Sequence, residues 1–250
     1  MMATEILPDP EALADRAAAW LLDAVQTTDG DFAIALSGGS TPRRLYELLA
    51  GAPYRDAMPW KRVHVFWGDE RFVSHSDTRS NYRMANEALL SHVPIAADHV
   101  HPVPTEAPTP ADAALAYERT LKSYYGADLL DPARPLFDVT LLGLGEDGHT
   151  ASLFPGTQAL AERDRWVVAV TEPGEPRISL TYPALESSRH IVFLVAGEEK
   201  RTIFERVRRG DRELPAARLR PNGSLVWFAD AAAVGQPTEN AKLTQPASRK

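Results

Sequence analysis

Short apolar segments alternate along the chain with longer segments in which apolar residues recur every three or four positions. The short segments are typical of buried β-strands, and the periodic segments are typical of amphipathic helices. We expect strands at residues 32–36, 63–67, 137–142, 166–170, 191–196 and 225–228. We expect helices at residues 11–25, 42–50, 82–90, 111–125 and 198–208.

The expected strands are almost continuously apolar, and helices separate them. Such strands are typical of a parallel sheet that is covered on both faces, so the sequence predicts a single α/β domain. We place this domain at residues 1–233 and expect the polar segment 234–250 to be a flexible tail. Ligands of parallel sheets bind in the loops at the carboxyl ends of the strands, so functional side chains are expected in those loops.

The composition narrows the classes of function. The 250 residues carry a formal net charge of −7 and include no cysteine. The negative charge argues against nucleic acid or an anionic membrane as the main partner, whereas a small anionic substrate needs only a local basic pocket. The lack of cysteine excludes a disulfide, a thiolate zinc site and a cysteine nucleophile. Neither a signal-peptide pattern nor an apolar run of ~20 residues is present, so we expect a cytoplasmic protein.

A glycine-rich loop follows the first expected strand, in the segment SGGSTPRRLYELL (residues 37–49). Gly38 and Gly39 allow a ligand to approach the backbone closely, and Ser40 or Thr41 can cap the following helix. The N–H groups at the start of that helix suit an anion. A capped turn with two solvent-facing arginines explains the same residues. The segment lacks G-K-[ST], so it is not a nucleotide-binding P-loop.

Three charged residues, Asp69, Glu70 and Arg71, follow the second expected strand. Neighbouring side chains diverge, so at most one of the two carboxylates is expected to face a site. Arg71 is a forked donor that suits phosphate or carboxylate. The alternative is a surface cluster of salt bridges. Further along, Ser80 is expected to cap the next helix.

The third expected strand leads into LGLGEDGHTASLFPG (residues 142–156), whose glycines form G-x-G-x-x-G. A dinucleotide site needs a long helix after these glycines, but Pro155 and Gly156 end any helix within about two turns. Glu146 and Asp147 would also repel a pyrophosphate. We therefore favour a second interpretation, in which the glycines form a frame for the histidine that follows them.

In this second interpretation, Asp147 and His149 form an acid–base pair. Histidine is the natural general base near neutral pH, and a neighbouring carboxylate orients its ring. With no cysteine and no G-x-S-x-G motif, the pair favours activation of water over covalent catalysis. A structural histidine is the alternative. Two ligands do not make a metal site, so no metal is expected.

The sequence resembles 6-phosphogluconolactonases, within the wider group of glucosamine-6-phosphate isomerases and deaminases. The resemblance runs from about residue 10 to residue 233 and is carried, in order, by SGGSTPRRLYELL, WGDERFV, SNYR, GLGEDGHTASLFPG, PRISLTYPAL, VFLVAGEEKR and LPAARLRPNGSLVWFADAAA. It implies a Rossmann-like, three-layer α/β/α fold with a mainly parallel sheet. It also implies hydrolysis of 6-phospho-D-glucono-1,5-lactone to 6-phospho-D-gluconate in the pentose phosphate pathway, without a metal or another cofactor.

The resemblance further implies roles for individual residues. His149 would be the catalytic base, with Asp147 beside it. The residues that would bind the phosphorylated sugar lactone are Ser37, Gly38, Gly39, Ser40, Asp69, Arg71, Arg177 and Lys200. Arg177 opens RISLTYP, whose alternation predicts a strand, and Lys200 lies in the first turn after the strand expected at residues 191–196.

Two other functions are weighed against the lactonase. A glucosamine-6-phosphate deaminase would have a glutamate five residues after the histidine, but this chain has Phe154 there. A non-catalytic sugar-phosphate sensor would not need the Asp147–His149 pair, and the first 30 residues are too short for a helix-turn-helix. We expect the protein to be a monomer or a weak homo-oligomer.

Overall fold

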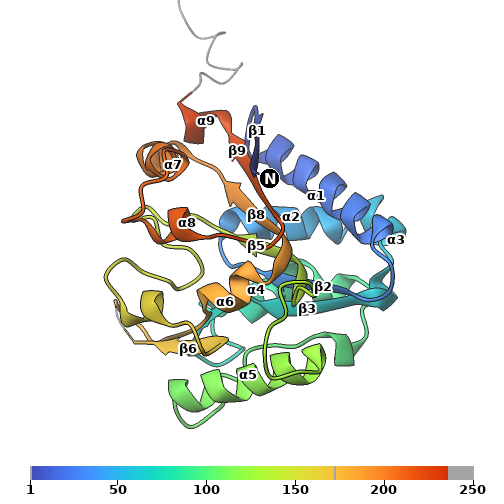
Figure 1. Cartoon of the computed structure of the whole chain (residues 1–250). Helices are drawn as coiled ribbons and strands as arrows, with labels where there is room; N and C mark the ends of the chain where they lie inside the picture. The colour runs from blue at the N-terminus through green and yellow to red at the C-terminus, as the bar shows by residue number, and fades with distance from the viewer. Residues whose placement is uncertain (1, 172, 236–250) are drawn as a thin grey trace, which may run out of the picture.

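Six strands of the computed structural model form one parallel sheet in the order β1-β9-β8-β5-β2-β3 (Figure 1). The structure describes residues 2–171 and 173–235. The six strands are β1 (Met2–Leu7), β2 (Phe32–Leu36), β3 (Val63–Trp67), β5 (Phe137–Leu142), β8 (Ser188–Val195) and β9 (Ser224–Asp230). All their pairings are parallel, which confirms the predicted sheet, although the edge strand β1 was not predicted.

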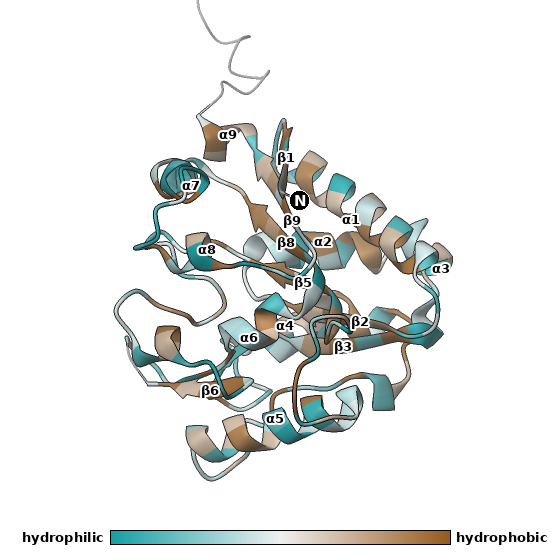
Figure 2. Cartoon of the chain, viewed as in Figure 1, coloured by the Kyte–Doolittle hydropathy of each residue, from teal (hydrophilic) through white to brown (hydrophobic). Residues whose placement is uncertain are grey.

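The central strands are apolar because helices cover both faces of the sheet. Every residue of β2 is buried, as are the last four residues of β5 and the last five of β8. Figure 2 shows β8 in the brown of hydrophobic residues and the outer helix α7 (Arg201–Arg208) largely in teal. Burial of apolar surface on both faces of the sheet is the main stabilising contribution to such a fold.

The helices lie on the two sides of the sheet, with α1 (Pro10–Thr27) on one side and α7 on the other (Figure 1). All five expected helices are present within a few residues of their expected bounds, and the last of them begins as a 3₁₀ turn. The remaining α-helices are α2 (Ser40–Leu49), α3 (Tyr54–Ala57), α4 (Asn81–Ala88), α5 (Pro110–Tyr125), α6 (Tyr182–Glu186), α8 (Pro215–Arg218) and α9 (Ala231–Val234). Short 3₁₀ helices are η1 (Trp60–Arg62), η2 (Leu90–His92), η3 (Ala97–His99), η4 (Gln158–Ala161) and η5 (Glu198–Lys200).

A second, antiparallel sheet in the order β4-β7-β6 corrects the sequence prediction. Its strands are β4 (Asp69–Arg71), β7 (Arg177–Leu180) and β6 (Val167–Val170). The strand expected at residues 166–170 therefore exists but lies outside the parallel sheet, and β4 was expected as a loop. Gly68 joins the two sheets, because its N–H donates to Leu36 O (2.9 Å) and its carbonyl accepts from Leu180 N (2.9 Å).

The described elements share one hydrophobic core. The last helix, α9, extends one residue past the expected domain boundary at residue 233, and residues 236–250 of the expected tail lie outside the described residues. In the part of the chain that the structure describes, no helix is both long enough and apolar enough to cross a membrane.

Candidate active site

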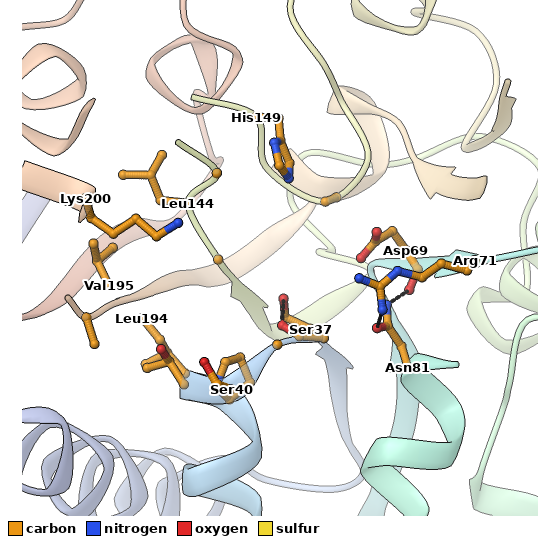
Figure 3. A pocket seen from close by; sticks show the side chains of 18 of the residues that line it. Ser37, Ser40, Asp69, Arg71, Asn81, Leu144, His149, Leu194, Val195 and Lys200 are labelled. Atoms are coloured by element: carbon orange, nitrogen blue, oxygen red, sulfur yellow. Dashed lines mark hydrogen bonds between the residues drawn. The ribbon is translucent and has the colours of Figure 1, made fainter. Parts of the chain in front are cut away.

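A cavity of about 260 Å³ opens at the carboxyl ends of β2, β5 and β8, beside the start of β4 (Figure 3). Its lining comes from Ser37, Gly38, Gly39, Ser40, Thr41, Pro42, Asp69, Arg71, Asn81, Gly143, Leu144, Gly145, His149, Ala151, Arg177, Leu194, Val195, Ala196 and Lys200. All eight residues expected to bind substrate are in this set, together with His149. The cavity thus lies where a parallel sheet binds its ligands.

The loop after β2 presents the start of helix α2 to the cavity. The expected cap by Ser40 or Thr41 is wrong: Gly39, with φ 107°, is the N-cap residue, and no side chain caps the helix. Both hydroxyl residues lie inside the first turn of α2 and not at its N-cap position. An uncapped helix N-terminus leaves N–H donors for an anion.

Two contacts hold this loop in place. The buried hydroxyl of Tyr46 accepts from Ser37 N (3.0 Å) and donates to Ser37 O (2.9 Å), so it satisfies both backbone groups of that residue. A Cβ at Gly38 would lie 2.0 Å from Asn81 Oδ1, so glycine is required for the close approach of Asn81. The two arginines of the first turn, Arg43 and Arg44, pair with Glu47 and Glu11 instead of lining the cavity.

The two neighbouring carboxylates of β4 have different roles, as the divergence of adjacent side chains predicts. Asp69 lines the cavity, whereas Glu70 is buried behind it. Glu70 accepts hydrogen bonds from Ser80 Oγ and from backbone N–H groups of Arg71, Asn81 and Tyr82. Burial raises the pKa of Glu70 despite these bonds. Glu70 therefore fixes the start of α4 against β4.

Asn81 is a cavity residue that the sequence analysis missed. Its side-chain oxygen accepts from Arg71 Nη1 (2.7 Å), and its amide donates to Asp69 O (2.9 Å). Figure 3 shows this bridge between Arg71 and Asp69 at one side of the cavity. The sequence offered one indication of this role, because Asn81 directly follows the predicted helix cap Ser80. The Ser80 side chain does cap α4, by accepting from Arg83 N.

The Asp69 carboxylate lies between two side chains from other segments. Ser152 Oγ donates to Asp69 Oδ2 at 2.6 Å, and Arg177 Nη1 lies 4.0 Å from the same oxygen. Arg177 reaches this position because its strand pairs with β4, with Arg71 opposite Arg177. The antiparallel sheet thus brings Asp69 and Arg177 together, although the two residues are more than a hundred positions apart in the sequence.

His149 and Asp147 form the hydrogen-bonded pair that the sequence predicts. His149 Nδ1 lies 2.6 Å from Asp147 Oδ1, which also accepts from the backbone N–H of His149 (3.0 Å). Partial burial raises the pKa of Asp147, but the bonds from His149 outweigh this effect and hold the pKa below its usual value. In a neutral imidazole ring, an ionised Asp147 favours the tautomer that carries its proton on Nδ1 and leaves the lone pair on Nε2. Asp147 itself does not line the cavity.

The glycines around this pair form a close-fitting frame. A Cβ at Gly145 would lie 2.1 Å from His149 Nδ1, so only glycine leaves room for the ring. Gly148 has φ 83°, and a Cβ there would also meet Leu214 at 2.8 Å. Turns follow Gly148 until the short η4 at Gln158, so the long helix of a dinucleotide site is not formed there. Ala151, which lines the cavity, has φ 48° in the same loop.

The cavity contains cationic groups with spare donors. Arg177 and Lys200 make no side-chain hydrogen bond to the described residues, and the nearest carboxylate to Arg177 is Glu175 at 3.8 Å. The Nε atoms of Arg71 and Arg177 are buried and unpaired within the described chain. Lys200 extends into the cavity from the end of η5 in Figure 3. This arrangement suits an anionic ligand, while residues 2–171 and 173–235 contain no cluster of metal-binding side chains.

Comparisons with known proteins agree with this site. The family described as glucosamine-6-phosphate isomerases/6-phosphogluconolactonase matches residues 8–227. A 6-phosphogluconolactonase of Nostoc is 43% identical over 236 residues, which cover 92% of this chain and 95% of that protein. A 6-phosphogluconolactonase of Streptomyces coelicolor is 38% identical over 240 residues, with 91% and 92% covered.

Solved structures show the same fold. The devB protein aligns with a TM-score of 0.85 at 34% identity over 94% of this chain and 99% of that chain. The 6-phosphogluconolactonase of Thermotoga maritima aligns with a TM-score of 0.77 at 32% identity, with 92% and 100% covered. The chain therefore belongs to the family of glucosamine-6-phosphate isomerases and 6-phosphogluconolactonases.

Proposed function

We propose that the protein is a 6-phosphogluconolactonase, which hydrolyses 6-phospho-D-glucono-1,5-lactone to 6-phospho-D-gluconate with His149 as the general base. The observation that carries this proposal is the geometry of His149. Its Nδ1 is held by Asp147, so its second nitrogen is available to a water molecule in the cavity. The relatives named 6-phosphogluconolactonase support the substrate.

Binding of the phosphorylated end of the lactone is the first step. The N–H groups at the start of α2 and the cations Arg71, Arg177 and Lys200 supply donors for the phosphate. Asp69 accepts hydrogen bonds from the sugar hydroxyls, because Ser152 already holds its carboxylate at the cavity wall. These contacts place the carbonyl carbon near His149, and correct placement alone lowers the barrier substantially.

The chemical steps need only one base. Nε2 of His149 takes a proton from water as the water oxygen bonds to the lactone carbonyl carbon. The tetrahedral intermediate then expels the ring oxygen, which takes the proton back from Nε2. Asp147 stabilises the imidazolium between these two transfers, and general acid–base help of this kind contributes roughly 10²–10⁴-fold.

The deaminase alternative lacks a carboxylate at the position expected for it. Phe154 is buried there, with its ring centroid 4.4 Å from that of His149. A phenyl ring cannot move a proton during sugar-ring opening. The apolar ring of Phe154 lies beside His149 and offers it no hydrogen bond. Asp147 is therefore the carboxylate that acts with His149.

The test is release of acid from freshly made lactone, measured above spontaneous hydrolysis, with a chelator present. We expect His149→Ala and Asp147→Asn to lower kcat by about 10²-fold or more. Glu146→Gln is the matched control, because Glu146 is an exposed neighbour outside the cavity lining. Full activity of a folded His149→Ala would reject His149 as the base, and an inactive folded wild type would reject the lactonase.

The cytoplasmic location and the state of monomer or weak homo-oligomer stay predictions. Light scattering on the purified chain over a range of concentrations tests the second of them.

A further inference from the structure

Three arginines surround a second cavity, away from the candidate active site. This cavity of about 300 Å³ is lined by Arg163, Tyr182, Glu186, Arg212 and Arg218. We propose that it is a second anion-binding site, which takes a small phosphate-bearing molecule. Its volume is similar to that of the first cavity, so it is large enough for a sugar phosphate as well as for free phosphate.

The charge of this cavity is not neutralised by the protein. None of its three arginines forms a salt bridge with a carboxylate of the described chain, although many other arginines do. The single acid, Glu186, accepts from the backbone N–H of Arg220 (2.7 Å), and burial raises its pKa. The lining therefore keeps a net positive charge in a chain whose total charge is −7.

Backbone carbonyls hold two of the guanidinium groups without reducing their charge. Arg163 Nη1 donates to Leu160 O (2.9 Å) and Glu162 O (2.6 Å), and its guanidinium lies 5.4 Å from the ring centroid of Tyr182. Arg218 Nε donates to Arg212 O at 2.6 Å. The remaining donors of Arg163 and Arg218 are thus fixed in place before a ligand arrives, which lowers the entropic cost of binding an anion.

The site is connected to the loop that carries His149. The Tyr182 hydroxyl donates to Pro215 O (2.9 Å), in the helix α8 that also carries Arg218. The next residue of the same helix, Ala216, donates from its N–H to Gly148 O (3.0 Å), and Gly148 directly precedes His149. An anion bound by Arg218 therefore lies one short helix away from the catalytic loop.

The experiment is a titration of the ¹⁵N-labelled full chain with inorganic phosphate and, separately, with glucose 6-phosphate, followed by NMR. We expect saturable shifts at Leu160, Tyr182 and Ala216, distinct from those at Gly39 and Ser40. The double variant Arg212→Gln/Arg218→Gln should weaken binding at the first group at least tenfold and leave the second group unchanged. Tighter binding of the ester identifies a sugar phosphate as the ligand, and equal binding identifies free phosphate.

The matched control is Arg55→Gln/Arg119→Gln, which removes the same charge at exposed positions outside this cavity. Equal weakening by both double variants, or the absence of saturable shifts at the first group, would overturn the proposal. If the first double variant does not fold, Arg212→Gln alone serves, because the Arg212 side chain makes no hydrogen bond to the described chain. Since these readouts follow binding at the second cavity, they are independent of lactonase activity.

Discussion

At the scale of single residues, the proposed acid–base pair of Asp147 and His149 depends on the absence of a side chain at Gly145. The ring of His149 occupies the space in which a Cβ of residue 145 would lie, and Asp147 Oδ1 is only 2.8 Å from the same point. The hydrogen bond between the two side chains can keep its 2.6 Å length only while this space is open. The glycine pattern of the loop is therefore explained by the histidine and not by a phosphate.

This leads to a prediction for Gly145→Ala. The new methyl group must displace the His149 ring, so we expect kcat to fall by about 10²-fold or more, as in the loss of a general base. Gly51→Ala is the matched control, since Gly51 lies outside the cavity lining and its Cβ would meet nothing closer than Leu48 O at 3.6 Å. The measurement is lactone hydrolysis together with the thermal unfolding midpoint of each variant. Equal activity of the two folded variants would contradict this account of the frame.

At the scale of elements, the start of α4 connects the Arg71 side chain to the backbone of strand β4. Asn81 is the first residue of that helix, and its side chain joins Arg71 to the backbone of Asp69. Glu70 fixes the same turn from the buried side. The first residue of α4 therefore orients the guanidinium group of Arg71 in the cavity.

We expect Asn81→Ala to raise KM for the lactone about tenfold with a smaller change in kcat, because Arg71 loses a hydrogen bond that orients it. The same change leaves Asp69 O without its side-chain donor, at a cost of about 1–3 kcal/mol in the free energy of unfolding. Steady-state kinetics and urea unfolding measure the two effects. A fall in kcat with unchanged KM would place Asn81 in the chemistry instead.

A second element-scale prediction concerns the contact between β3 and the segment after η3. His101 stacks on Phe66 at 4.4 Å between ring centroids, and its Nε2 lies 3.1 Å from His64 Nδ1. Burial lowers the pKa of His101 to about 4, with His64 and His99 adding to this effect and Asp98 opposing it. The unfolded chain therefore binds a proton between pH 6.5 and about 4 that the folded chain does not bind.

The sign follows from this difference in bound protons. Stability is complete above the unfolded pKa and falls as the pH decreases from 6.5 towards 4. We expect the urea midpoint of the wild type to drop between pH 7 and pH 5, and His101→Gln to drop less over the same interval. Equal drops in the two proteins would show that His101 does not carry the effect.

At the scale of the whole molecule, the pattern of apolar positions predicts most helices and central strands. It misses strands that form only by pairing with a segment far away in the sequence. The strands β2, β3 and β5 have their expected bounds, because largely apolar runs form them. The strand β1 was missed, since Thr4 and Glu5 interrupt its apolar pattern and only β9 holds it. The strand β4 has three polar residues and exists through its pairing with β7.

The site shows the same division. Loop residues such as Ser40 and His149 could be predicted because glycines and strand ends mark them in the sequence, and the structure places them in one cavity. Asn81 could not be predicted as a site residue, because its role comes from hydrogen bonds to Arg71 and Asp69, which lie on the strand β4. The missing cap of α2 was also hidden, since hydroxyl residues stand where a cap is usually found.

Gly68 lies where the parallel sheet meets the antiparallel sheet, and each sheet supplies a different part of the site. The loop of His149 follows the parallel sheet, whereas Asp69, Arg71 and Arg177 belong to the antiparallel one. Gly68 connects the two sheets, because its N–H donates to Leu36 O of the parallel sheet and its carbonyl accepts from Leu180 N of the antiparallel sheet. Substitutions in β4 or β7 can therefore alter Asp69, Arg71 or Arg177 at one wall of the cavity, while the loop of His149 keeps its place after β5.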